Sequence, residues 1–159
     1  MAIPDFVLKL RAKIGHDPLW LVGVTAVVLR DGCTGRQVLL VRRADNGQWT
    51  PVTGIVDPGE QPAAAAVRET LEEADVIAEP LRLAGIGITE PVTYANGDVS
   101  QYVDLTFRCA YVSGEPRPAD GENTAAAWFD LDGLPPMRPE MLARLDQALS
   151  DAPAAAFSR

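Results

Sequence analysis

The chain has 159 residues, of which 47% are hydrophobic, and its formal net charge is −8 at pH 7. Such a length and composition predict one globular domain with a substantial core, and they exclude a disordered chain. The acidic balance argues against non-specific binding to DNA or RNA, whose backbones it repels, but a phosphorylated small molecule is compatible with it because a bound cation inverts the local field.

The first segment, residues 3–14, has apolar residues at helical spacing with basic residues between them: Phe6, Val7, Leu10 and Ile14. This pattern predicts a short amphipathic helix. A basic amphipathic helix can lie on a membrane, but a helix this short is expected to pack on its own domain.

The N-terminal segment is interrupted by charged residues, and no run of about 18 uncharged apolar residues occurs, so neither a secretory signal nor a membrane span is predicted. Two cysteines, Cys33 and Cys109, form no disulfide framework and no zinc-binding spacing. A reducing, cytoplasmic compartment is therefore expected. The single histidine, His16, is expected to be structural or exposed.

The first half of the chain predicts a β-hairpin and then a helix. Residues 21–30 are rich in β-branched side chains and predict a buried strand, and residues 37–43 predict the strand that returns after a turn. Residues 44–54 are interpreted as a polar loop. The alanine-rich segment 62–74 is the strongest helix prediction, since Pro62 suits the first turn of a helix.

The second half predicts several strands and a final helix. Residues 79–89 favour a strand, and an Asn-Gly turn at 96–97 between two strand-like runs predicts a second hairpin. A short strand is expected at 125–131, a helix at the end of 132–150, and a frayed tail over 151–159. With no internal repeat and no long linker, this order predicts one domain over 1–159, built as a mixed sheet with helices on both faces.

Three glutamates crowd the predicted helix 62–74. Because successive residues advance by about 100°, Glu72 and Glu73 lie within about 60° of Glu69 on one face. No lysine or arginine follows four residues after Glu69 or Glu72, so the helical ion pairs that relieve repulsion are missing. The opposite face would be the apolar, buried one, and it carries Ala63, Ala64, Val67, Leu71 and Ala74.

Two interpretations of this acidic face remain open: a solvated charged surface, or a site for a divalent cation, since Mg²⁺ prefers oxygen ligands. The preceding loop favours the second, because Gly54 and Gly59 let the backbone come close to a ligand. Glu60 would either cap the helix or contact a metal or another carboxylate. Arg68 could pair with a carboxylate and orient it.

The segment 54–76 resembles the Nudix box: glycine, five residues, Glu, seven residues, Arg-Glu, an aliphatic position, any residue, Glu-Glu, any residue, glycine and an aliphatic residue. The matching positions are Gly54, Glu60, Arg68, Glu69, Glu72, Glu73 and Val76. Two positions depart from it. Thr70 replaces an aliphatic residue, and Asp75 replaces the glycine at the helix end, where an acid is mildly unfavourable. Neither removes a metal-binding carboxylate, so activity is expected to survive.

The resemblance implies an α/β/α sandwich with a mixed central β-sheet, and hydrolysis of a nucleoside diphosphate linked to another moiety. ADP-ribose and a (d)NTP-like nucleotide are the leading candidates, with Mg²⁺ or Mn²⁺ as the cofactor and homodimers common among relatives. By this resemblance the metal ligands are Glu69, Glu72, Glu73 and the carbonyl of Gly54, while Arg68 and Glu60 orient the carboxylates.

The resemblance leaves the catalytic base and the substrate contacts open. The base is a box glutamate or a loop acid such as Glu122, for which an exposed loop position is the alternative. Arginines can clamp phosphates and aromatic rings can stack on a base, so the substrate-side candidates are Arg42, Arg43, Trp49 and Tyr94. Trp49 could equally fill the core. Pro91 is spaced from the box as in ADP-ribose pyrophosphatases of the family.

Two other functions occur on this fold. A nucleotide-sensing module that regulates a partner without cleaving the nucleotide would be expected to have lost box glutamates, and here all are present. A prenyl diphosphate isomerase would call for a cysteine near the pocket, and neither cysteine has a convincing setting. The hydrolase is therefore the preferred prediction.

Overall fold

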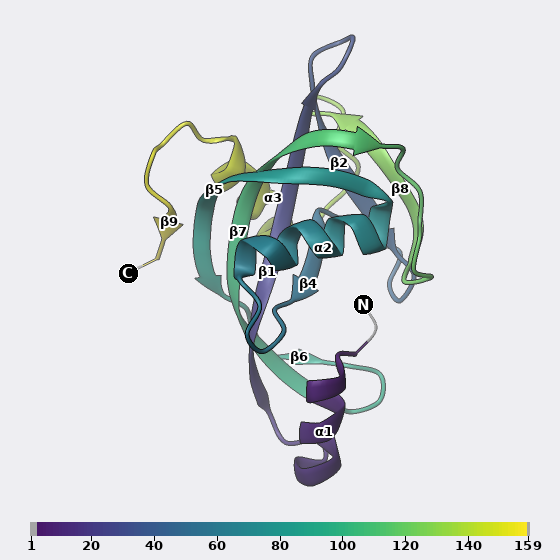
Figure 1. Cartoon of the computed structure of the whole chain (residues 1–159), viewed down its shortest axis with the longest axis vertical. Coiled ribbons are helices and arrows are strands. Elements are labelled where there is room, and N and C mark those ends of the chain that lie inside the picture. Colours follow the sequence, from purple (N-terminus) through teal and green to yellow (C-terminus); the bar gives the residue numbers. More distant parts are fainter. Residues whose placement is uncertain (1–2, 159) are drawn as a thin grey trace.

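The computed structural model describes residues 3–158, which form three helices and nine strands along one sheet. In Figure 1 the colours follow the chain from purple at the N-terminus to yellow at the C-terminus. Their bounds are α1 Asp5–Ile14, β1 Leu19–Asp31, β2 Arg36–Arg43, β3 Trp49–Thr50, β4 Val52–Ile55, α2 Pro62–Ala74, β5 Val76–Ile88, β6 Val92–Thr93, β7 Val99–Gly114, β8 Asn123–Asp130, α3 Pro139–Leu149 and β9 Ala156–Phe157.

The centre of the sheet is the long strand β1, which pairs in parallel with β7 from Leu19↔Ser100 to Leu29↔Ala110. Its other edge is shared by two strands: β4 pairs with its central residues, from Gly23 to Ala26, and β2 pairs with its last residues. β2 then pairs with β8, and β7 pairs with β5. The length of β1 therefore places β4, which contains Gly54, beside the middle of the sheet.

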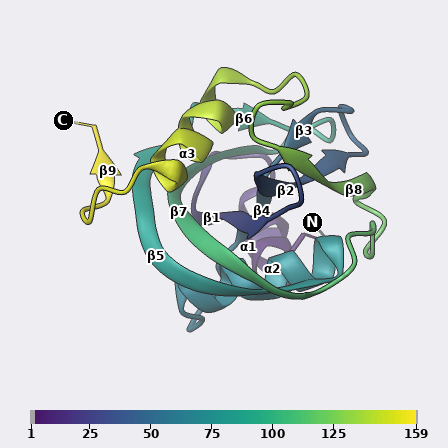
Figure 2. The same cartoon turned by 90° about the horizontal axis from the view of Figure 1, so that it is seen from above.

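Helices cover both faces of this mixed sheet (Figures 1 and 2). One face packs against the alanines of α2, and the other packs against Leu145 and Ala148 of α3. Alternate residues of β2 serve the two faces, with Leu39 on the α2 side and Leu40 on the α3 side. The predicted α/β/α sandwich with a mixed central sheet is confirmed.

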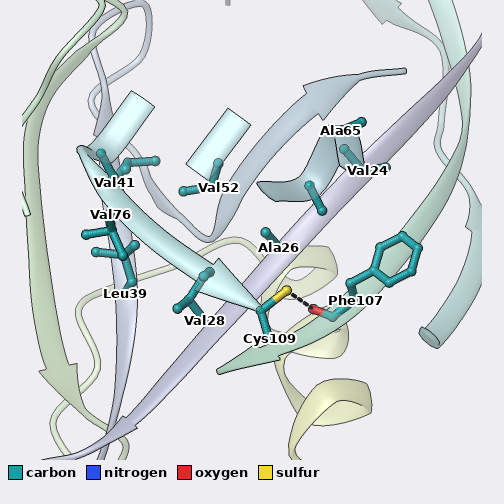
Figure 3. Packing of buried hydrophobic residues seen from close by; sticks show 13 residues of the cluster. Val24, Ala26, Val28, Leu39, Val41, Val52, Ala65, Val76, Phe107 and Cys109 are labelled. Atoms are coloured by element: carbon teal, nitrogen blue, oxygen red, sulfur yellow. Dashed lines mark hydrogen bonds between the residues drawn. The ribbon is translucent and has the colours of Figure 1, made fainter. Parts of the chain in front are cut away.

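The core beneath α2 is built from small and β-branched side chains of several strands (Figure 3). Cys109 lies within it, and its Sγ is 3.9 Å from the carbonyl oxygen of Phe107. Burial raises the pKa of the Cys109 thiol to about 12, so this cysteine stays protonated. Cys33 lies exposed in the turn between β1 and β2, and both thiols are free.

Helix α3 is tied to the sheet by a buried polar cluster. Asp104 of β7 accepts hydrogen bonds from the hydroxyls of Thr25 and Thr106, both at 2.9 Å. Arg144 of α3 lies 3.3 Å from the same carboxylate and donates to Thr25. Burial raises the pKa of Asp104, against the lowering effect of Arg144. The sequence offered no sign of this contact, because its members lie on three separate elements.

Helix α1 packs on its own domain, as predicted, through Val7 against Leu21 and Ile55. Its Arg11 donates to the carbonyl of Val99 at 2.7 Å, and His16, just after the helix, lies 2.8 Å from Asp98. Both contacts reach the β6–β7 hairpin, whose Asn-Gly turn is confirmed. In the part of the chain that is described, no helix is long and apolar enough to cross a membrane.

Two expectations about the fold were wrong. Residues 44–54 are not all loop, since they contain β3 and most of β4, which are short and become strands only through pairing with β2 and β1. The expected frayed tail contains β9, which pairs in parallel with Gly85 and Ile86 of β5, while Arg159 lies outside the described residues.

Candidate active site

The face of α2 that packs on the sheet carries two of the glutamates. Glu69 is 4% exposed and Glu73 is 2% exposed, whereas Leu71, expected on the buried face, is 45% exposed. The prediction of an apolar stripe opposite the carboxylates was therefore wrong. The buried face consists of Ala65, Ala66, Glu69, Thr70, Glu73 and Ala74. Glu72 alone projects outward, and its side chain is 52% exposed.

Glycine at position 54 leaves the space that Glu69 occupies. A Cβ atom built on Gly54 would lie 2.1 Å from Cγ of Glu69, well inside van der Waals contact. Any other residue at this position of β4 would push the carboxylate away. Burial raises the pKa of Glu69, while Arg68 and a hydrogen bond from the Ile55 backbone lower it.

Arg68 binds the acidic residues together. Its Nε and Nη2 bind both oxygens of Glu60, at 2.8 and 2.9 Å, in the two-pronged geometry that favours arginine. Its Nη1 donates to Glu69 at 3.0 Å and to Glu72 at 3.1 Å. Its Nη2 also donates to the carbonyl of Ile55 at 3.1 Å. The pKa of Arg68 is raised, mainly by Glu60, and Arg68 in turn lowers the pKa of Glu60.

This arrangement corrects two expectations. The glutamates do have a helical cation, because Arg68 precedes Glu72 by four residues and pairs with it. Glu60 does not cap α2, whose N-cap residue, Gln61, makes no side-chain cap bond. Instead both oxygens of Glu60 accept hydrogen bonds from Arg68, and its positioning role stays a prediction.

Glu73 is the most enclosed of the carboxylates. Its Oε2 accepts a hydrogen bond of 3.1 Å from Nδ2 of Asn123. Its Oε1 is buried and has no hydrogen-bond partner among the described residues. Burial raises the pKa of Glu73 to about 7, the Asn123 bond lowers it, and the charges of Glu69 and Asp120 raise it further.

The loop between β7 and β8 brings two more acids to Glu73. One carboxylate oxygen from each of Glu73, Asp120 and Glu122 lies within 4.8 Å of the others. The backbone of this loop is held on the end of α2, because Arg117 N–H donates to the carbonyl of Ala74 at 3.1 Å. Glu122 was predicted from its place in the loop, but Asp120 and Asn123 were not. No local signal marks them, since their role depends on a contact some 50 residues away along the chain.

The sequence model of the NUDIX domain matches residues 20–151. The chain belongs to the Nudix family. It is 35% identical to a MutT-like protein of Streptomyces ambofaciens over 136 residues, which are 85% of this chain and 80% of that protein. It is a Nudix hydrolase, an enzyme of a class that cleaves pyrophosphate bonds.

The chain is also similar to a longer curated protein and to a solved structure. The chain is 31% identical over 121 residues to the NAD-capped RNA hydrolase NudC of Vibrio cholerae, covering 73% of this chain but only 42% of that protein. Among solved structures, a MutT NUDIX hydrolase from Burkholderia pseudomallei superposes with a TM-score of 0.65 at 30% identity, covering 81% of this chain and 98% of that one.

The Nudix box departs from its usual pattern at Asp75, and the geometry explains how the residue is accommodated. Asp75 closes α2 in the left-handed conformation, with φ 56° and ψ 34°, and its N–H donates to the carbonyl of Leu71 at 3.0 Å. Aspartate tolerates this conformation better than most residues. Its carboxylate pairs with Nε of Arg117 at 2.7 Å, which offsets the unfavourable charge at the helix end. The other departure, Thr70, is buried with its hydroxyl donating to the carbonyl of Ala66 at 2.7 Å.

Replacing Asp75 tests this account of the helix end. Asp75→Ala should lower the free energy of unfolding by about 1 kcal/mol, because a Cβ-bearing residue without a compensating polar group is strained at positive φ. Asp75→Gly should stay within about 1 kcal/mol of the wild type, since glycine removes the strain and loses only a surface ion pair. Urea unfolding of both variants measures the difference. Equal losses of unfolding free energy in Asp75→Ala and Asp75→Gly would show that the left-handed backbone conformation does not affect stability.

The predicted substrate residues of this Nudix domain separate into two groups. Arg43 is close enough to Glu73 and to Tyr94 to interact with both electrostatically. Burial lowers the pKa of Arg43, but Asp45, Glu73 and Tyr94 raise it more. The net shift of the Arg43 pKa is therefore upward. Tyr94 has its hydroxyl 2.6 Å from that of Tyr102, and burial and this bond raise its pKa. The role of Arg43 and Tyr94 as substrate residues stays a prediction.

Arg42 and Trp49 turn to the other face. Trp49 packs with the cluster under α3 and meets the ring of Phe129 edge-on, with centroids 4.8 Å apart. Of the two roles considered for Trp49, the structure therefore supports the core one. Arg42, which pairs with Trp49 across β2 and β3, donates to the carbonyl of Gly47 at 3.2 Å.

Proposed function

We propose that this Nudix domain is a divalent-cation-dependent pyrophosphohydrolase that cleaves a nucleoside diphosphate linked to another moiety. The observation that carries the proposal is Oε1 of Glu73, a buried carboxylate oxygen without a hydrogen-bond partner among the described residues. A buried oxygen left unpaired costs free energy, and a cation would recover it. Asp120 and Glu122 supply further oxygens close by.

The donor set suits a hard cation. Every candidate ligand is an oxygen: the carboxylates of Glu69, Glu72 and Glu73 and the carbonyl of Gly54, with the loop acids beside them. Such a set fits Mg²⁺ or Mn²⁺ and offers nothing to a soft metal. When bound, the cation would neutralise charge on the phosphoryl oxygens and lower the pKa of a bound water.

The chain's own residues have separate tasks in this proposal. Arg68, held by Glu60, lowers the pKa of Glu69 against the effect of burial and would orient its carboxylate. Glu122 is the candidate for the base that accepts the proton of the attacking water, because it lies beside Glu73 on a loop that faces the site. Arg43 and Tyr94 would contact the phosphates and the nucleoside, respectively.

The substrate class follows from the shared chemistry. Similarity to an NAD-capped RNA hydrolase at 31% identity adds dinucleotides to the two leading candidates, ADP-ribose and a (d)NTP-like nucleotide. Each of these carries the pyrophosphate that a cation at Glu73 would bind, so only a comparison of their rates of hydrolysis can distinguish them.

A substrate panel tests the proposal, with ADP-ribose, NTPs, oxidised dNTPs, NADH and NAD-capped RNA each incubated with Mg²⁺, Mn²⁺ or EDTA. We expect cation-dependent turnover of at least one substrate, with cleavage inside the diphosphate. Glu122→Gln should reduce kcat by about 100-fold or more if Glu122 is the base. The matched control is Glu115→Gln, which removes an exposed glutamate of the same loop and should leave the rate unchanged. No turnover of any substrate would favour the nucleotide-sensing module instead.

A further inference from the structure

The hydrogen bond between Asn123 and Glu73 is made possible by an irregularity in the sheet. β2 pairs with β8 in regular register from Gln37↔Asp130 to Arg42↔Ala125, and the next pair is Arg43↔Asn123. Thr124 is therefore an extra residue in β8, which makes this a β-bulge. Bulges change the direction in which the following side chains point, and they occur often beside active sites.

The bulge decides which side chain of β8 faces α2. Ala126 and Trp128 pack on the α2 side of the sheet, so strict alternation would turn Thr124 to that side next. Instead Thr124 is exposed, and its hydroxyl donates to the carbonyl of Arg42 at 3.3 Å. Asn123 takes the inward position, where it is 6% exposed and its Nδ2 reaches Glu73.

We propose that Asn123 is a positioning residue: it fixes Oε2 of Glu73 by its amide and thereby presents Oε1 of Glu73 to the cation. The inference rests on the proposed metal-dependent function. An amide donor suits this task, because it binds one carboxylate oxygen without adding a charge to a site that already holds Glu69 and Asp120. Oε2 of the buried Glu73 accepts this bond, whereas Oε1 has no hydrogen-bond partner among the described residues.

Loss of such an outer hydrogen bond typically weakens metal binding by about 10- to 100-fold. Asn123→Leu removes the donor while nearly keeping the side-chain volume, and Asn123→Ala removes it without risking a clash. We expect both variants to bind Mn²⁺ at least about 10-fold more weakly than the wild type. At saturating Mn²⁺, KM for the substrate should change little.

The experiment measures the Kd of Mn²⁺ for the full chain by electron paramagnetic resonance of the free ion, with thermal unfolding of each variant in parallel. Thr124→Val is the matched control, since it alters the neighbouring residue, which is exposed. This variant should bind Mn²⁺ with the Kd of the wild type. A lower melting temperature with unchanged Mn²⁺ affinity in both Asn123 variants would overturn the inference, because it would leave Asn123 a purely structural role.

The outcomes separate this inference from the proposed function. If the wild type binds Mn²⁺ and the Asn123 variants bind it weakly, the inference stands even where no substrate of the panel is hydrolysed. If the wild type hydrolyses a substrate and the variants keep its Mn²⁺ affinity, only the inference fails. A wild-type chain that binds no Mn²⁺ would overturn both.

Discussion

Glu73→Gln is expected to abolish most cation-dependent hydrolysis while the fold is retained. The amide keeps the size of the side chain and can still accept the bond from Asn123, but it carries no charge for a cation. A fall in kcat of at least about 100-fold is expected, because the substitution removes a ligand and not merely a group that supports one. Steady-state kinetics on the best substrate of the panel, over a range of Mg²⁺, would measure it. Full activity in this variant would contradict the assignment of Glu73.

The same substitution should stabilise the cation-free protein at alkaline pH. The pKa of Glu73 is raised to about 7 by burial, so the folded protein holds this proton more tightly than the unfolded chain does. The stability that the protonated Glu73 contributes is fully present below the pKa of a glutamate in the unfolded chain. It is lost as the pH rises through the folded-state pKa of about 7. Glutamine does not titrate, so its contribution to stability does not change with pH. The free energy of unfolding of the variant should therefore exceed that of the wild type by on the order of 2 kcal/mol at pH 8 and by little at pH 4.5.

Urea unfolding in EDTA at the two pH values measures this difference. Glu72→Gln is the matched control, because its side chain is half exposed and its loss should change the pH dependence of stability little. A wild type and a Glu73→Gln variant that lose stability in parallel between the two pH values would contradict the burial of an ionised carboxylate at this position.

Arg68→Ala should cause the largest loss of stability. The side chain makes five hydrogen bonds, three of them to Glu60 and Glu69, and Glu69 is almost fully buried. Removing one partner of a fully buried ion pair costs about 3–5 kcal/mol, because the remaining charge is left uncompensated. The Arg68 side chain is 30% exposed, so the loss should lie at or below the lower end of that range. Activity should fall as well, since Glu69 would lose its orientation.

The matched control is Arg117→Ala, which removes an exposed arginine that pairs with Asp75 at the surface and should cost no more than about 1 kcal/mol. Arg68→Lys should recover part of the loss, because lysine keeps the charge but cannot bind both oxygens of Glu60. Denaturant unfolding of the three variants gives the comparison. An Arg68→Ala variant within about 1 kcal/mol of the wild type would contradict a central role for this side chain.

The elements that depend on local pattern were predictable. The strand at 21–30, the helix at 62–74 and the Asn-Gly hairpin each have a sequence signal within a few residues, and all three are present. The strands β3 and β4 have no such signal. They span two and four residues and exist because β2 and β1 supply their hydrogen-bonding partners.

The face that α2 buries could not be predicted from the pattern of its apolar residues. Counting apolar residues placed Leu71 inside and the glutamates outside, whereas Glu69 and Glu73 are buried and Leu71 is exposed. Alanine is small enough for either environment, so the helix has no strong apolar stripe to fix its rotation. The space above Gly54 and the contacts of distant residues decide which face is buried.

The sequence by itself determined the box: the helix, the spacing that places three glutamates on one side of it, and an arginine four residues before Glu72. These depend only on the 3.6-residue period of the helix. Only the tertiary structure decided that Glu73 is enclosed, that Asn123 binds one of its oxygens and that Asp120 approaches it. Burial and hydrogen bonding set the charge of a carboxylate and what it can bind, and both come from residues far along the chain.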